Sequence, residues 1–115
     1  MWRDEAYFLD ILIAARKVKR YLSGVTEEEF AQNELLQDAT VRQLEIIGEA
    51  ARRVSEEARK AHPEVPWHEL IGMRNRLIHE YFRVDVPKVW DTALNDIPVL
   101  IALMEPLVPP EGEVQ

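Results

Sequence analysis

The feature of this 115-residue sequence that most constrains its fold is the recurrence of apolar residues at the three- and four-residue spacing of an α-helix. This spacing predicts helices over residues 4–22, over about 26–61, over about 67–81 and from Asp85 onward. No stretch shows the alternation of apolar and polar residues that predicts a β-strand. The sequence therefore predicts an all-α protein, an up-and-down bundle of four to five helices joined by short loops.

The start of the second helix is well marked. Thr26 and Glu29 have the spacing of a capping box, in which each residue's side chain binds the backbone N–H of the other. Val25 is placed to pack on Phe30 as a hydrophobic staple. Gly24, just before these residues, is expected to end the first helix, because glycine readily adopts the backbone conformation of a helix C-terminus.

Several positions interrupt the helical pattern. A break is expected near Asn33 or Asp38. Gly48 lies inside the second helix, where glycine costs about 1 kcal/mol relative to alanine. It therefore indicates the close approach of another backbone, either in the core or across a dimer interface. Pro66 fits the first turn of the third helix, and Pro98 is expected to kink or divide the fourth.

The same periodicity predicts a single domain over residues 1–107 and a flexible tail over 108–115. The residues that it predicts to face inward are Phe8, Ile11, Leu12, Ala15, Val18 and Leu22 in the first helix; Leu36, Leu44, Ile47, Ala51, Val54 and Ala58 in the second; Trp67, Leu70, Ile71, Arg74, Leu77, Ile78 and Tyr81 in the third; and Val89, Trp90, Ala93, Ile97, Leu100, Ile101 and Met104 in the fourth.

The composition excludes several classes of function. The absence of cysteine excludes disulfides, thiolate metal sites and a cysteine nucleophile. No apolar run reaches the roughly 18 residues of a membrane span, and the N-terminus does not resemble a signal peptide, so we expect a cytoplasmic protein without membrane contact. The net charge of −7 argues against a general nucleic-acid binder. Residues 52–83, with seven basic and five acidic groups, are the one segment of positive balance, which permits a local phosphate site.

Arg74, Asn75, Arg76, His79 and Tyr81 crowd into eight residues near the end of the third predicted helix. Histidine accepts and returns a proton near neutral pH, whereas the permanently charged fork of arginine fits phosphate oxygens. Such a pair is the minimum for cleaving RNA without a metal. His79 would deprotonate a ribose 2′-hydroxyl, Arg74 would stabilise the phosphorane, and the products would carry cyclic 2′,3′-phosphate ends.

Helix geometry restricts how this pair can work. Successive residues of an ideal helix turn by about 100°, so Arg74 and His79 lie about 140° apart. They converge only if the helix unwinds near its end, if the Arg74 side chain curls round, or if a second subunit presents its own copy opposite. A purely structural role, pairing with carboxylates or capping carbonyls, is the alternative. His62, His68 and His79 do not have metal-ligand spacing, so we predict neither a metal nor a cofactor.

The stretch Gly72-Met-Arg-Asn-Arg-Leu-Ile-His-Glu-Tyr resembles the Arg-x4-His-x-Tyr motif of the HepT-like toxins, which belong to the HEPN superfamily of helical ribonucleases. The resemblance covers nearly the whole chain, including the Pro-Trp pair before the motif. It implies a HEPN-like fold in which Arg74 and His79 are the catalytic pair. Asn75 matches the polar residue beside that arginine, and we assign Asn75 and Arg76 to substrate positioning.

The resemblance also implies partners. It implies a homodimer with a composite active cleft, encoded beside an MntA-type nucleotidyltransferase antitoxin in a type VII toxin–antitoxin system. In this family the antitoxin transfers AMP to the motif tyrosine, here Tyr81, and so silences the nuclease. The added phosphates would compete with the RNA phosphate for Arg74. One alternative stays open, since the net charge is −7: a non-catalytic helical dimer that docks a nucleotidyltransferase or binds nucleotide.

Overall fold

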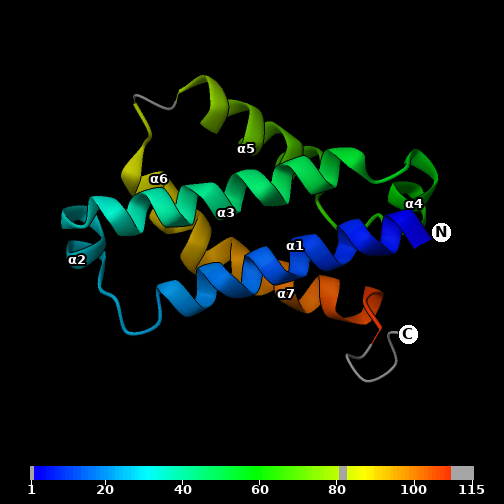
Figure 1. Cartoon of the computed structure of the whole chain (residues 1–115), viewed down its shortest axis with the longest axis horizontal. Coiled ribbons are helices and arrows are strands. Elements are labelled where there is room, and N and C mark those ends of the chain that lie inside the picture. The colour runs from blue at the N-terminus through cyan, green and yellow to red at the C-terminus, as the bar shows by residue number, and fades with distance from the viewer. Residues whose placement is uncertain (1, 81–82, 110–115) are drawn as a thin grey trace.

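The computed structural model describes residues 2–80 and 83–109, which form helices and no strand (Figure 1). The predicted all-α fold is therefore confirmed. The elements in chain order are α1 (Trp2–Tyr21), α2 (Glu27–Gln32), α3 (Glu34–Arg53), α4 (Glu56–Ala61), α5 (Trp67–His79), α6 (Val86–Asp91), the π-helical segment η1 (Thr92–Asp96), α7 (Ile97–Met104) and the 3-10 turn η2 (Glu105–Leu107).

Helix α3 is the centre of the bundle. It packs extensively against α1 on one side and against α5 on the other, and α7 packs against α1. Figure 1 shows that α1 and α3 run in opposite directions and that α5 reverses the direction again. The up-and-down arrangement follows from the short connections, because helices joined by short loops pack as antiparallel neighbours. The candidate motif on α5 is thereby laid along the middle of α3.

The core is one continuous apolar cluster, and most residues predicted to face inward are buried in it. Each fully buried large side chain contributes about 1.5–3 kcal/mol relative to exposure. Ile78 departs from the prediction, because it is 40% exposed near the end of α5. Tyr81 lies outside the described residues. The predicted residues that are only partly buried against the cluster are Leu22, Leu36, Ala58, Ile71 and Leu77.

The predicted start of the second helix is confirmed. The Thr26 hydroxyl accepts a hydrogen bond from the Glu29 N–H at 3.1 Å, and the Glu29 carboxylate accepts one from the Thr26 N–H at 2.9 Å. Gly24 stands just before this capping box with φ +76°, the left-handed conformation expected where a helix has ended. The predicted break at Asn33 is also present, since the Asn33 side chain caps α3 by accepting from the Leu36 N–H at 3.0 Å.

A second break, between α3 and α4, corrects the expectation that the helix continues to about residue 61. The Ser55 hydroxyl accepts from the Ala58 N–H at 3.1 Å and caps α4. The Ser55 N–H and O–H both donate at 2.8 Å to the buried carboxylate of Asp4 in α1. Burial raises the pKa of Asp4, but these two hydrogen bonds outweigh burial and hold it below its usual value. A buried carboxylate 51 residues away thus favours the break.

Helix α5 begins one residue after Pro66, which occupies the N-cap position rather than the predicted first turn. The Trp67 indole N–H donates to the carbonyl of His62 at 2.9 Å, and the Trp67 ring lies 6.0 Å from the ring of Phe8. These contacts fix the direction in which α5 leaves the connection. The helix ends at His79, before the predicted end at residue 81.

The last helical stretch is divided, as Pro98 predicted. Asp85 caps α6 by accepting from the Lys88 N–H at 3.1 Å, and the π-helical segment η1 lies between α6 and α7. Pro98 lacks an N–H, so the carbonyl of Leu94 loses its helical donor at this point. Within the described residues, no helix combines the length and the apolarity needed to cross a membrane. Most of the predicted tail, residues 110–115, lies outside the described residues.

Candidate active site

Helices α3 and α5 approach each other closely at Gly48. A Cβ atom built on Gly48 would lie 2.1 Å from the Cβ of Arg74 and 2.7 Å from the carbonyl oxygen of Leu70. Real Cβ atoms do not approach other atoms so closely, so any side chain at Gly48 would push α5 away. Of the two interpretations of this glycine, close approach within one chain is therefore the one the structure supports.

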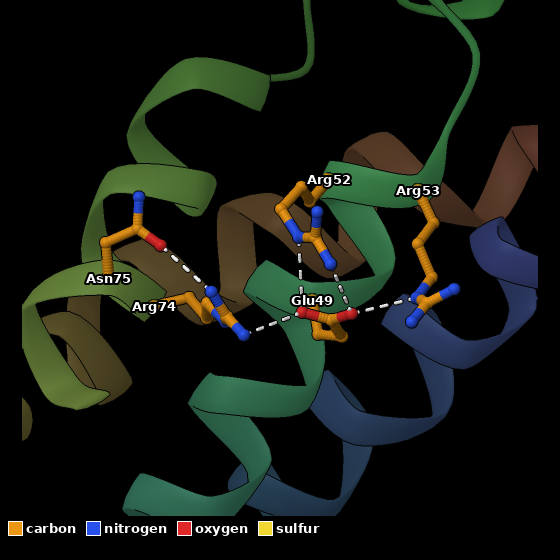
Figure 2. A network of polar contacts seen from close by, with 5 residues as sticks. All are labelled: Glu49, Arg52, Arg53, Arg74 and Asn75. Atoms are coloured by element: carbon orange, nitrogen blue, oxygen red, sulfur yellow. Dashed lines mark hydrogen bonds and ion pairs between the residues drawn. The ribbon is translucent and has the colours of Figure 1, made fainter.

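The Arg74 side chain is held between two polar partners (Figure 2). One terminal nitrogen, Nη2, forms an ion pair with Oε1 of Glu49 at 3.0 Å. The other, Nη1, donates to the amide oxygen of the neighbouring Asn75 at 3.1 Å. The Nε atom is buried and has no hydrogen-bond partner among the described residues. Because the side chain is 26% exposed, the guanidinium is anchored to α3 while part of it still reaches solvent.

Glu49 also forms ion pairs with two arginines in the following turn of α3. Its Oε2 atom lies 3.0 Å from Nη2 of Arg52 and 2.8 Å from Nε of Arg53. The hydrogen bond from Arg52, supported by Arg53 and by the charge of Arg74, lowers the pKa of Glu49 to about 2, although burial opposes the shift. Glu49 is therefore a stable anion, and Arg74 has a permanent counter-ion.

Arg74 also lines an open hollow of about 410 Å³ between α1, α3 and α5. Both acidic and basic side chains line it, so a phosphate would meet cations together with carboxylates. His79 is not among the lining residues. The lining side chains include Tyr7, Asp10, Arg42, Glu45, Glu49, Arg53, Arg74 and Ile78.

His79 is the last residue of α5 and is exposed. Among the residues that the structure describes, its imidazole has no hydrogen bond or ion pair. Helix α5 stays helical through His79, and Arg74 is held toward α3. Neither unwinding before His79 nor a curled Arg74 side chain brings the pair together within one chain.

The remaining motif residues lie in different surroundings. Asn75 is exposed and contacts Arg74. Arg76 lines a separate hollow on the other side of α5, together with Met73 and Lys88. Tyr81, the predicted site of AMP addition, lies outside the described residues. In the described ranges, 2–80 and 83–109, no group of three or more His, Asp or Glu side chains is arranged to hold a metal ion.

Glu49 is the residue that sequence reasoning missed. Its spacing to Arg52 and Arg53 is typical of ion pairs on a helix surface, and that local signal was available. The third partner, Arg74, lies 25 positions further along the chain, and only the packing of α5 on α3 brings it to Glu49.

Comparison with known proteins places this chain in a family. The model of the family described as "Ribonuclease HepT-like" matches residues 11–107, a range that includes both Glu49 and the motif. The chain is 40% identical to "Probable ribonuclease HepT" of Thermococcus cleftensis over 101 residues, which is 88% of this chain and 92% of that protein. It is 39% identical to "Putative RNase MJ1380" of Methanocaldococcus jannaschii over 94 residues, 82% of this chain and 86% of that protein.

A third relative is "Putative RNase TTE0752" of Caldanaerobacter subterraneus, 47% identical over 79 residues, 69% of this chain and 70% of that protein. No solved structure gives a significant match. The family match spans most of the chain and includes the whole of α5, which confirms the ribonuclease family expected from the motif. The chain thus belongs to the HepT-like ribonuclease family.

Proposed function

We propose that this protein is a metal-independent endoribonuclease, with Arg74 and His79 as its catalytic pair. His79 removes the proton from a ribose 2′-hydroxyl, which attacks the adjacent phosphorus. The bond to the 5′-oxygen breaks, this oxygen takes a proton from water, and a cyclic 2′,3′-phosphate and a 5′-hydroxyl are left; His79 then returns its proton to the solvent. Arg74 stabilises the extra negative charge of the phosphorane. Asn75 and Arg76 position the substrate.

The observation that carries this proposal is the state of Arg74. Its guanidinium is fixed by Glu49 and Asn75, yet the side chain remains 26% exposed at the edge of a hollow. A preorganised cation stabilises charge that develops in a transition state without first having to reorganise. The exposed imidazole of His79 lies five residues along the same helix, and the chain belongs to a ribonuclease family.

We propose further that the site is completed by a second copy of the chain. One chain holds Arg74 toward α3 and leaves His79 at the exposed end of α5. A two-fold interface along α5 places two copies of each group around one cleft, so that the arginine of one protomer meets the histidine of its partner.

The regulatory part of the proposal rests on the motif tyrosine. The protein acts as the toxin of a type VII system in the cytoplasm, and an MntA-like nucleotidyltransferase silences it by transferring AMP to Tyr81. Tyr81 follows His79 by two residues in the sequence, so a phosphate attached there competes with the RNA phosphate for Arg74.

RNA cleavage by the purified protein in the presence of EDTA tests the proposed reaction. We expect products with cyclic 2′,3′-phosphate ends. Arg74→Ala and His79→Ala are each expected to lower the rate by about 10²–10³-fold while the helical circular dichroism spectrum is kept. His68→Ala is the matched control, because His68 is also exposed on α5 but lies outside the motif.

Cleavage at an undiminished rate by the Arg74→Ala/His79→Ala double variant would show that the catalytic residues are wrongly assigned. Intact RNA at high protein concentration, together with tight binding of a nucleotidyltransferase, would support the second candidate function. In that case the chain is a non-catalytic dimer that docks the nucleotidyltransferase or binds nucleotide, and the net charge of −7 favours such a role.

A further inference from the structure

We propose that Glu49 is a positioning residue, whose carboxylate holds the Arg74 guanidinium in the orientation that meets the scissile phosphate. This inference rests on the proposed ribonuclease function and extends it to a residue of α3, outside the motif. Three observations carry it: the ion pair between the two side chains, the arginines that surround Glu49, and the glycine that precedes it.

The Arg74 side chain is held at both of its ends. An arginine side chain has many rotamers, and fixing it on a surface needs a strong partner. Here the backbone of α5 is seated on Gly48, so that the base of the side chain lies directly over α3. Glu49, the next residue of α3, then meets the other end of the side chain at 3.0 Å. Adjacent residues of one helix therefore fix both ends of the Arg74 side chain.

Glu49 is kept ionised by two neighbouring arginines. A protonated Glu49 would hold Arg74 only weakly, but Arg52 and Arg53 lie 3.0 Å and 2.8 Å from its carboxylate. They stabilise the anion, so the ion pair persists throughout the pH range in which ribonucleases work. Figure 2 shows Arg53 on the opposite side of the carboxylate from Arg74, whereas Arg52 lies between the two and binds both carboxylate oxygens. Arg53 supports Glu49 at Oε2 alone, and Arg52 shares Oε1 with Arg74 through a longer hydrogen bond of 3.4 Å.

The exposed ion pairs of Glu49 matter more for the position of Arg74 than for the stability of the fold. The side chains of Arg52 and Arg53 are 50% and 53% exposed, and ion pairs at such exposure contribute little to folding. Three guanidinium groups share the carboxylate of Glu49, so this cluster of four side chains carries a net positive charge that can attract phosphate. The consequence expected from losing Glu49 is therefore a misplaced Arg74 in a folded protein, not an unfolded protein.

Steady-state kinetics of the Glu49→Gln variant test this inference, because glutamine keeps the shape and removes the charge. We expect kcat for RNA cleavage to fall by about 10–100-fold, since small errors in placing a catalytic group are costly. KM should change by less than about threefold, because the other cations still attract RNA. Glu49→Asp should recover part of the lost kcat. The matched control is Glu45→Gln, one turn earlier on α3 and lining the same hollow.

A double-mutant cycle shows whether Glu49 acts through Arg74. In the Arg74→Ala background, Glu49→Gln should cause no further loss of kcat, since the group that it positions is gone. A full additional loss would overturn the inference. So would an unchanged kcat in Glu49→Gln, or a raised one, because a raised kcat means that Glu49 competes with the substrate phosphate for Arg74.

Hydrogen exchange of the Arg74 Nε–H, followed by NMR, tests the anchor independently of cleavage. This N–H is buried, so we expect slow exchange in the wild type and in Glu45→Gln, and at least about tenfold faster exchange in Glu49→Gln. Equal exchange in all three proteins would refute the anchor even if RNA is cleaved. Conversely, if the wild type cleaves no RNA while exchange responds to Glu49, the proposed function fails and the contact stands.

Discussion

The two ends of the motif on α5 have different surroundings, since Arg74 is bound by neighbouring side chains and His79 is exposed. At Arg74 the helix is pressed onto Gly48, and the side chain is bound by Glu49 and Asn75. At His79, the last residue of the helix, the side chain is exposed, and the preceding Ile78 is 40% exposed. One half of the proposed catalytic pair is thus fixed by its own chain, and the other half is left at the surface.

This difference fits the proposed site, in which one helix supplies groups to a cleft shared by two protomers. An arginine that stabilises charge must be held in place before the reaction, and a neighbouring helix of the same chain can do this. A histidine that reaches into the partner's cleft must instead stay uncovered until the partner arrives. The exposed Ile78 beside it is apolar surface that such an interface would bury.

The largest effect is expected when the two ends come from different protomers. A heterodimer of an Arg74→Ala protomer and a His79→Ala protomer keeps one arginine and one histidine, on opposite chains. If they meet across the interface, the heterodimer should recover about half of the wild-type rate, whereas each mutant homodimer stays about 10²–10³-fold lower. The measurement is RNA cleavage by heterodimers purified with two different affinity tags.

Recovery should be lost when both substitutions are placed on one protomer and that protomer is paired with a wild-type protomer, because each shared site then lacks either its arginine or its histidine. A heterodimer no more active than the two mutant homodimers would mean that the arginine and histidine act within one chain. The contrast between a fixed and an unpartnered end of α5 would then have no catalytic meaning.

A smaller effect is expected from substituting Gly48, where α5 packs closely on α3. Gly48→Ala gains about 1 kcal/mol of helix propensity but places a Cβ where the Arg74 Cβ and the Leu70 carbonyl already lie. Overpacking of this kind costs typically about 1–3 kcal/mol. We expect a net loss of up to about 2 kcal/mol in the free energy of unfolding, measured in urea, and a lower rate of RNA cleavage because Arg74 is displaced.

Gly72→Ala is the matched control for this variant. A Cβ on Gly72 would meet only the Arg76 side chain, at 3.6 Å, which is ordinary contact. We therefore expect Gly72→Ala to stabilise the protein by up to about 1 kcal/mol, as helix propensity alone requires. Equal effects of the two substitutions would show that α5 does not rest on Gly48.

The smallest effect is expected in the dependence of stability on pH. The pKa of Glu49 is lowered from 4.5 to about 2 in the folded protein. A group with a lowered folded pKa contributes stability above its unfolded pKa and loses it as the pH falls toward the folded pKa. The difference in unfolding free energy between wild type and Glu49→Gln should therefore be constant from pH 7 to about 5 and should shrink between about pH 4.5 and 2. Urea unfolding at a series of pH values measures it, and a difference that does not change with pH would show that Glu49 is not ion-paired.

Much of the fold could be predicted because its signals are local. The helical spacing of apolar residues gave the helices, and Thr26, Asn33 and Pro98 marked where they begin, break or divide. The break at Ser55 has a local signal, a serine N-cap followed by two acidic residues, but its hydrogen bonds to the buried carboxylate of Asp4, 51 residues earlier in the chain, could not be predicted. Sequence spacing gives no information about a hydrogen bond of that range.

In the motif, too, local features could be predicted from the sequence, whereas contacts between helices could not. The sequence by itself determined the family, the helix and the two residue types suited to phosphate chemistry, since these depend on identity and spacing along one segment. It left the role of Gly48 open, and for Glu49 it offered only the local spacing to Arg52 and Arg53, which does not point to Arg74. Only the tertiary structure decided that Gly48 seats Arg74, that Glu49 binds it and that His79 stays exposed. The physical reason is that α3 and α5 are separate segments, and the contact between their side chains exists only after the helices have packed.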